Sequence, residues 1–204
     1  MDQGTKEWWE LHRGRPTASN FDRIITPKTM KPSSQEDGYI CELIAQIMLP
    51  QMNMVPDSYI SRPMLDGIAL EPEARRWYEF EREVEVTQIG FVHTDCGRFG
   101  CSPDAMIGTE GCLELKCPLP KTHIAYLIAG TLPDDYRCQV HGELLVTGCA
   151  WCDFVSYCPS LPPFIVRVTP DKFTEELAKC LNRFDALFRQ RLAFCQSKLG
   201  AKNG

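Results

Sequence analysis

The sequence lacks the features of membrane proteins and of proteins that coat nucleic acids. No apolar run approaches the roughly 20 residues that a helix needs to span a bilayer, so we expect no transmembrane helix. Basic residues are not in excess, because 22 Lys and Arg face 27 Asp and Glu, for a net charge of -5. A general nucleic-acid coat protein is usually basic, so the net charge argues against this class. The net charge does not exclude a nuclease, because an acidic metal site can coexist with a local basic channel.

Internal repeats and low-complexity segments are also lacking. The first ten residues, MDQGTKEWWE, are polar and acidic rather than signal-like, so we expect a cytoplasmic protein. The 11 cysteines are an odd number in a mid-sized chain, whereas disulfide frameworks are typical of small secreted domains with paired spacings. We therefore predict free thiols, which often serve as small buried apolar residues.

Helical and strand-like patterns are present along the whole chain. Helical spacing of apolar residues predicts helices at 36–50, 64–82, 120–130, 134–147 and 170–195, with shorter ones near 5–14 and after Thr17. Strand-like segments lie at 84–92, 98–101, 104–107, 111–117, 151–158 and 164–168. This order predicts an α/β (α+β) fold in which a central mixed sheet is flanked by helices. Residues 51–63 are expected to be irregular.

The stretch CSPDAMIGTEGCLELKCP, residues 101–118, contains the candidate catalytic residues. In an extended segment side chains alternate, so Glu114 and Lys116 point to the same face. A hairpin would bring Asp104 near them. Carboxylate oxygens are the ligands that Mg²⁺ prefers, and a lysine beside such an ion could steer a water molecule. The same residues could form a surface ion pair of little energetic value, and the motif alone leaves both interpretations open.

The surrounding segments give a specific resemblance. They are, in order, EWWELHRGRPTAS, GIALEPEARRWYEF, GCSPDAMI, GCLELKCP, YRCQVHGELLVTG and WCDFVSYCP. With these segments, over roughly residues 7–158, the chain resembles the lambda exonuclease / YqaJ family of phage recombination nucleases in the PD-(D/E)xK superfamily. The resemblance implies a restriction-endonuclease-like core in a single nuclease domain, residues 1–204. That domain would comprise a helical N-terminal region (residues 1–83), a catalytic sheet with helices (84–169) and a C-terminal helix (170–198).

The resemblance also implies the residues of the active site. The metal ligands would be Asp104, Glu114 and the backbone carbonyl of Leu115. Lys116 would be the catalytic lysine. Glu71 matches an acidic residue that reaches a second metal ion, and Gln139 matches a glutamine on a helix that faces the same site. The implied cofactor is Mg²⁺, as two ions, with Mn²⁺ able to substitute.

A second group of residues would bind the 5′-phosphate of the substrate strand. Ser19 and Ser102 match the positions that surround this phosphate in the family. The family has an arginine seven residues before the first serine, where this chain has His12 followed by Arg13. Either residue could bind the phosphate, and this departure leaves the strength of 5′-phosphate selection open. Ser19 could alternatively cap a helix, and Ser102 could be a turn residue.

The implied activity is Mg²⁺-dependent 5′→3′ digestion of one strand of double-stranded DNA from its ends, giving 5′-mononucleotides and a 3′ overhang. The implied partners are DNA ends, a single-strand-annealing recombination protein and two further copies of the chain in a trimeric ring. The source would be a phage or prophage in a bacterial host. The alternatives are an endonuclease of the restriction or junction-resolving type, a binding module with a vestigial site, and a cysteine-rich metal protein.

The cysteines and histidines have a less specific pattern. Cys149 and Cys152 have the CxxC spacing of zinc sites, and four further cysteines bracket the motif. Cys112 and Cys117 are five positions apart and would face opposite sides of one strand, so we favour buried thiols over a metal site. No pair of histidines has metal-ligand spacing, which predicts satisfied core or surface residues at His93, His123 and His141.

Overall fold

Helices form the N-terminal region of the chain. The structure is a computed structural model that describes residues 5–50 and 62–200. Its first elements are α1 (Lys6–His12), the 3₁₀ helix η1 (Ala18–Arg23), α2 (Glu36–Met48) and α3 (Arg62–Arg82). The four predicted helices are therefore present, and Pro72 lies inside α3. Most of the segment predicted to be irregular, 51–61, lies outside the described residues.

A mixed four-stranded sheet follows, as predicted. Its strands, in spatial order, are β3 (Ala105–Ile107), β4 (Gly111–Lys116), β5 (Trp151–Ser156) and β6 (Phe164–Val168). β4 and β5 are parallel, and the other neighbours are antiparallel. Parallel strands need a long crossover, which α4 (Pro120–Ala129) and α5 (Asp134–Thr147) supply. A two-stranded sheet of β1 (Val92–His93) and β2 (Gly100–Cys101) stands apart.

The predicted strand at 84–92 is wrong for most of its length. Val92 belongs to β1, and Thr87 makes one isolated bridge to Met106. Val84 and Val86 do pack against the core, which explains their alternating pattern. β3, the neighbouring strand, has only three residues, so it offers little backbone on which a ladder could continue. Burial thus produced a strand-like pattern without a strand.

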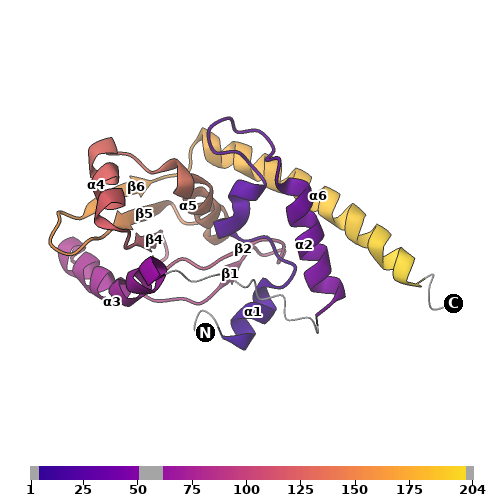
Figure 1. The fold of residues 1–204 in the computed structure, drawn as a ribbon, viewed down its shortest axis with the longest axis horizontal. Helices are drawn as coiled ribbons and strands as arrows, with labels where there is room; N and C mark the ends of the chain where they lie inside the picture. The colour runs from indigo at the N-terminus through magenta and orange to yellow at the C-terminus, as the bar shows by residue number, and fades with distance from the viewer. Residues whose placement is uncertain (1–4, 51–61, 201–204) are drawn as a thin grey trace.

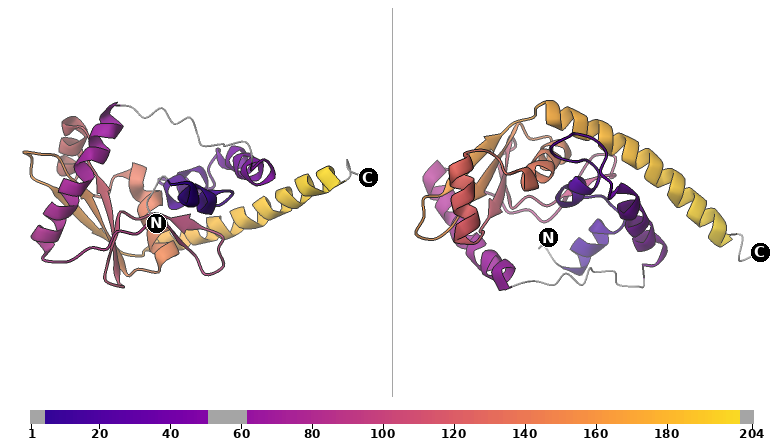
Figure 2. Two further views of the ribbon diagram at one scale, coloured as in Figure 1. Left: turned by 90° about the horizontal axis from the view of Figure 1, so that it is seen from below. Right: turned by 45° about the horizontal axis from the view of Figure 1, so that its top comes forward.

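Helices cover both faces of the sheet (Figures 1 and 2). On one face, Leu113 and Leu115 pack against Tyr78 of α3. On the other, Cys112 and Phe154 belong to a cluster with residues of α5. A third cluster joins η1, α2 and α6 (Lys172–Gly200). The far end of α6 extends beyond the rest of the molecule in Figure 1. No helix in the described regions of the chain is long and apolar enough to cross a membrane.

The contact between α5 and η1 depends on Gly142. A Cβ atom at this position would lie 2.5 Å from Cδ2 of Phe21 and 3.0 Å from Cβ of Ala18. Distances this short are incompatible with a larger residue unless the helices separate. Gly142 thus allows η1, which carries Ser19, to pack directly on α5, which carries Gln139.

Candidate active site

The β3–β4 hairpin brings Asp104 to β4. Ala105 pairs with Leu113 across the hairpin, and Asp104 comes immediately before this pair. The backbone N–H of Asp104 donates to the Leu113 carbonyl at 3.0 Å, and its Oδ2 accepts from the Leu115 N–H at 2.6 Å. The carboxylate is therefore held against β4 by backbone hydrogen bonds.

Glu114 and Lys116 lie together on β4, facing α5. The Lys116 ammonium forms an ion pair with Oε1 of Glu114 and lies 5.3 Å from the ring centroid of Tyr136. The same Oε1 accepts a hydrogen bond from Nε2 of Gln139 on α5 at 2.6 Å. Glu114 is only 1 % exposed. The structure thus brings together the strand residues and the helix residue that the sequence assigned to one site.

When Asp104 and Glu114 are both ionised, their two negative charges outnumber the single positive charge of Lys116. Burial, and to a smaller extent repulsion by Glu114, raise the pKa of Asp104 to about 8. Lys116 and the hydrogen bond from the Leu115 N–H act in the opposite direction. Burial alone would lower the pKa of Lys116, but Glu114 and Asp104 outweigh it and raise this pKa. Two neighbouring carboxylates that share one ammonium favour the binding of a cation. Because their donor atoms are oxygens, they fit a hard ion such as Mg²⁺.

Glu71 lies farther out, on α3. Burial raises its pKa, while Lys116 and Arg75 lower it and Glu114 raises it. The charged groups of the site therefore influence the ionisation of Glu71. Among the described residues, however, no set of donor atoms within 4.8 Å of one another joins it to Asp104 and Glu114.

Glu143 was not identified from the sequence. It lies one helical turn after Gln139, is 1 % exposed, and accepts a hydrogen bond from Nε2 of Gln139 at 3.1 Å. Burial raises its pKa well above the usual value, and repulsion by Glu114 contributes. The signal that was available is the spacing QVHGE, which places Gln139 and Glu143 on one face of a helix. The Gln139 amide thus bridges two buried carboxylates.

Both serines follow a contact that joins the residue before η1 to β2. Thr17 and Gly100 form a parallel bridge, and Ser19 and Ser102 each lie two residues farther along the chain. Oγ of Ser102 accepts a hydrogen bond from the Trp8 indole at 3.2 Å, which ties α1 to the segment that leads into Asp104. The exposed Ser19 lies with its Oγ 3.3 Å from Oγ1 of Thr17.

His12 and Arg13 have different environments. The His12 ring centroid lies 3.5 Å from that of Trp8 and 4.3 Å from that of Phe91. Burial lowers the pKa of His12, and the charge of nearby Arg15 lowers it further. The hydrogen bond to the Trp8 carbonyl raises it but does not outweigh the burial. The imidazole is therefore neutral at pH 7. Arg13, at the end of α1, is exposed.

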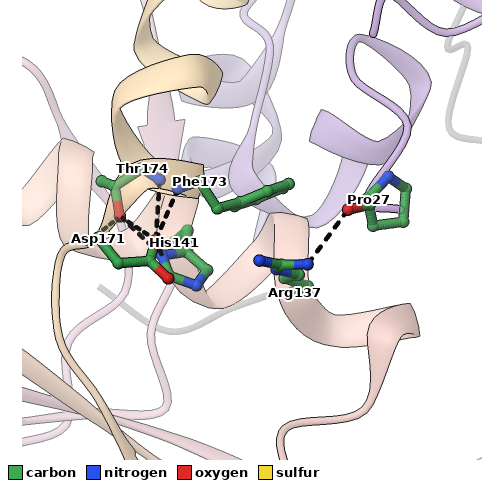
Figure 3. Close-up of polar contacts among 6 residues, drawn as sticks. All are labelled: Pro27, Arg137, His141, Asp171, Phe173 and Thr174. Atoms are coloured by element: carbon green, nitrogen blue, oxygen red, sulfur yellow. Dashed lines mark hydrogen bonds and ion pairs between the residues drawn. The ribbon is translucent and has the colours of Figure 1, made fainter. Parts of the chain in front are cut away.

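The other face of α5 contains a separate polar cluster (Figure 3). Nδ1 of His141 lies 2.8 Å from Oγ1 of Thr174 and 3.6 Å from Oδ1 of Asp171. Arg137 donates to the Pro27 carbonyl at 3.3 Å. Arg137 and His141 flank Gln139 by two positions, which turns them about 200° away around the helix. The cluster and the shallow pocket beside it are therefore apart from the candidate site.

The remaining histidines have the roles that the sequence predicted. His141 is buried and hydrogen-bonded, as is His123, between Oγ of Ser156 at 2.7 Å and the Pro162 carbonyl at 2.9 Å. His93 is exposed. The prediction of satisfied core or surface histidines is confirmed.

Comparisons with known proteins agree with this fold. The model of the YqaJ-like viral recombinase domain matches residues 7–150. A search of curated proteins found no match. Among solved structures, an alkaline exonuclease (LHK-Exo) from Laribacter hongkongensis has a TM-score of 0.83 at 30% identity, covering 98% of this chain and 100% of that chain.

Two further structures are similar. LHK-Exo in complex with dAMP has a TM-score of 0.83 at 32% identity, with 98% of this chain and 100% of that chain covered. A phage related exonuclease from Haemophilus somnus has a TM-score of 0.67 at 11% identity, covering 91% and 98% of the two chains, and shows the shared fold alone. With the family match over residues 7–150, these likenesses show that the chain belongs to the YqaJ-like viral recombinase family and is a nuclease of the lambda exonuclease type.

Proposed function

We propose that this nuclease digests one strand of double-stranded DNA from its ends in the 5′→3′ direction, with Mg²⁺, to give 5′-mononucleotides and a 3′ overhang. The observation that carries the proposal is the pair of carboxylates, buried Glu114 and half-buried Asp104, beside the Lys116 ammonium. The similar alkaline exonuclease is known in complex with the mononucleotide dAMP, which supports a mononucleotide product.

The proposed metal ligands are Asp104, Glu114 and the backbone carbonyl of Leu115, with Glu71 assigned to a second ion. Mg²⁺ or Mn²⁺ bound there would supply Lewis acidity to the scissile phosphate. These residues fit a metal ion because Asp104 and Glu114 repel one another away from bulk water, so that a cation beside them is favoured. We assign Glu71 to a second ion because its oxygens do not form a set with those of Asp104 and Glu114 in which all donor atoms lie within 4.8 Å of one another.

Lys116 and Gln139 would act on the attacking water and the phosphate. The raised pKa of Lys116 keeps the amine protonated at neutral pH. We therefore assign it the role of a positive charge that stabilises the developing negative charge, rather than that of a base. Nε2 of Gln139 donates to both Glu114 and Glu143, which leaves its Oε1 as the acceptor that can orient a water molecule.

A 5′-phosphate would be bound by the hydroxyls of Ser19 and Ser102 and by the Arg13 guanidinium. Hydroxyls and a guanidinium suit a phosphate dianion, and Arg13 is the exposed cation of this segment, whereas His12 is neutral. For the acidic chain to follow DNA, we further propose a trimeric ring whose basic channel surrounds the duplex, and transfer of the overhang to an annealing protein. In this proposal the whole chain, residues 1–204, acts as a single nuclease domain.

Labelled DNA substrates test the activity directly. With Mg²⁺, a linear duplex with 5′-phosphates should be degraded to mononucleotides, and a closed circle of the same sequence should stay intact. A linear duplex with 5′-hydroxyls should be degraded about tenfold more slowly, which is the effect of losing charge-assisted hydrogen bonds worth about 1.5 kcal/mol. Cleavage of the circle would instead support the endonuclease, and binding without digestion would support the binding module.

The affinity for Mg²⁺ should depend on pH. Asp104 has a raised pKa of about 8, and a carboxylate must lose its proton to bind a metal. Below this pH the ion must displace a proton, so the apparent affinity should rise by about tenfold per pH unit and level off above the pKa. Digestion rates at limiting Mg²⁺ between pH 6 and 9 would measure this. An affinity that is constant over this range would contradict the assignment of Asp104 as a ligand.

A further inference from the structure

A second group of potential metal ligands lies beneath the active site. The Sγ atoms of Cys112 and Cys152 and a carboxylate oxygen of Glu143 all lie within 4.8 Å of one another, and all three residues are buried. Within residues 5–50 and 62–200, no other set of three His, Cys, Asp or Glu side chains is as close. This group shares no residue with the proposed Mg²⁺ site.

The fold brings these residues together from three rigid elements. Cys112 and Cys152 occupy paired positions on the parallel strands β4 and β5. Both belong to the cluster that packs against α5, from which Glu143 projects. Sγ of Cys152 lies 3.7 Å from Oε2 of Glu143. In tetrahedral zinc sites, with Zn–S of about 2.3 Å and Zn–O of about 2.0–2.2 Å, neighbouring S and O ligands are about 3.6 Å apart.

A further cysteine lies in the same cluster. Cys149, the first cysteine of CAWC, is buried with Cys112 and Cys152. Its Sγ, however, is not one of the donor atoms that lie within 4.8 Å of one another. Cys149 lies in the loop before β5, and Cys152 lies on β5 with the CxxC spacing. This spacing is typical of structural zinc sites.

We propose that Cys112, Cys152 and Glu143 bind one Zn²⁺ ion as a structural site, and that Cys149, from the adjoining loop, completes the coordination when the metal is bound. Thiolates are soft ligands that select zinc over Mg²⁺, so the two sites would hold different metals. Binding would release the thiol protons to solvent. It would also compensate the buried Glu143 carboxylate, whose hydrogen-bond donors in the described structure are the Gln139 amide and the Cys152 thiol.

The sequence favoured buried thiols because it paired Cys112 with Cys117. In the structure Cys112 pairs instead with Cys152, on the next strand, and Glu143 adds a ligand that the cysteine spacing could not show. Gln139 links the two proposed sites, since its amide contacts both Glu143 and Glu114. A zinc ion would thus hold Glu143 in place behind Gln139.

Elemental analysis of untagged protein tests the proposal. We expect one zinc per chain after dialysis against zinc and gel filtration, and loss of this zinc in the Cys112→Ser/Cys152→Ser variant. The matched control is Cys41→Ser/Cys96→Ser, which changes two exposed cysteines and should retain the zinc. Folded wild-type protein without stoichiometric zinc would overturn the proposal, as would a Cys112→Ser/Cys152→Ser variant that retains it.

A spectroscopic measurement covers a variant that does not fold. Wild-type protein loaded with Co²⁺ should show thiolate-to-cobalt charge-transfer absorption in the near ultraviolet, and its absence would equally overturn the proposal. Asp104→Asn should keep both the zinc and this absorption while losing Mg²⁺-dependent digestion. The zinc site and the proposed nuclease mechanism can therefore fail independently.

Discussion

Replacing Lys116 with alanine should reduce Mg²⁺-dependent digestion of linear duplex DNA by roughly 100- to 1,000-fold, as expected for the loss of one group that stabilises transition-state charge. The ammonium is the cation paired with Glu114, and Glu114 and Asp104 keep it protonated. Alanine removes this charge and leaves the two carboxylates without it. Single-turnover digestion of a 5′-phosphorylated duplex at saturating Mg²⁺ would measure the effect on the chemical step.

The matched control is Lys179→Ala, on α6. Lys179 is an exposed lysine that pairs with Glu176, so its loss should leave the rate within a factor of about two, because surface ion pairs contribute little. Circular dichroism should show both variants folded. A Lys116→Ala variant that digests DNA at the wild-type rate would refute the assignment of the catalytic lysine.

Replacing Asp153 with alanine should destabilise the protein by about 1–4 kcal/mol. Asp153 is fully buried and accepts hydrogen bonds from the Tyr78 hydroxyl at 2.8 Å and from Nε and Nη2 of Arg167 at 2.8 and 2.9 Å. Its loss would leave the Tyr78 hydroxyl buried without an acceptor, at a cost of about 1–3 kcal/mol. The Arg167 side chain is half exposed, so water would solvate its charge and this part of the loss is about 0–1 kcal/mol.

Thermal unfolding would measure this loss as a fall in Tm of roughly 2–16 °C. Tyr78→Phe is the informative comparison, because it removes the hydroxyl and its need for an acceptor together and leaves both Arg167 hydrogen bonds in place. We expect it to cost about 1 kcal/mol. Equal destabilisation by the two variants would show that the Asp153 carboxylate contributes nothing beyond the tyrosine contact.

The sequence predicted those elements of the fold in which local pattern and burial agree. Residues 36–50 have apolar residues at helical spacing and form α2. Residues 111–117 alternate and form β4. Residues 84–92 alternate too, yet pair only at Thr87 and Val92. Pairing depends on the length of the neighbouring strand, and this is not encoded in the segment itself.

For the candidate site, the sequence identified charged residues near one another in the chain but not their buried partners. Asp104, Glu114 and Lys116 lie in one short hairpin, so their proximity followed from strand alternation. Glu143 was missed because it meets Glu114 only through Gln139 on α5. Away from the site, Asp153 likewise depends on Tyr78 and Arg167, which meet it through the packing of α3 and the β5–β6 register. Such long-range contacts are set by tertiary packing.

Gly142 has a consequence for how the proposed enzyme would advance along DNA. The Phe21 ring and the Ala18 methyl lie directly against the bare backbone of α5 at this point, so the separation between the turn that carries Ser19 and the helix that carries Gln139 has little freedom to vary. An enzyme that removes one nucleotide at a time needs a constant span between the place where it holds the strand end and the place where it breaks the bond. The absence of a side chain at Gly142 would then help to keep this span constant from one nucleotide to the next.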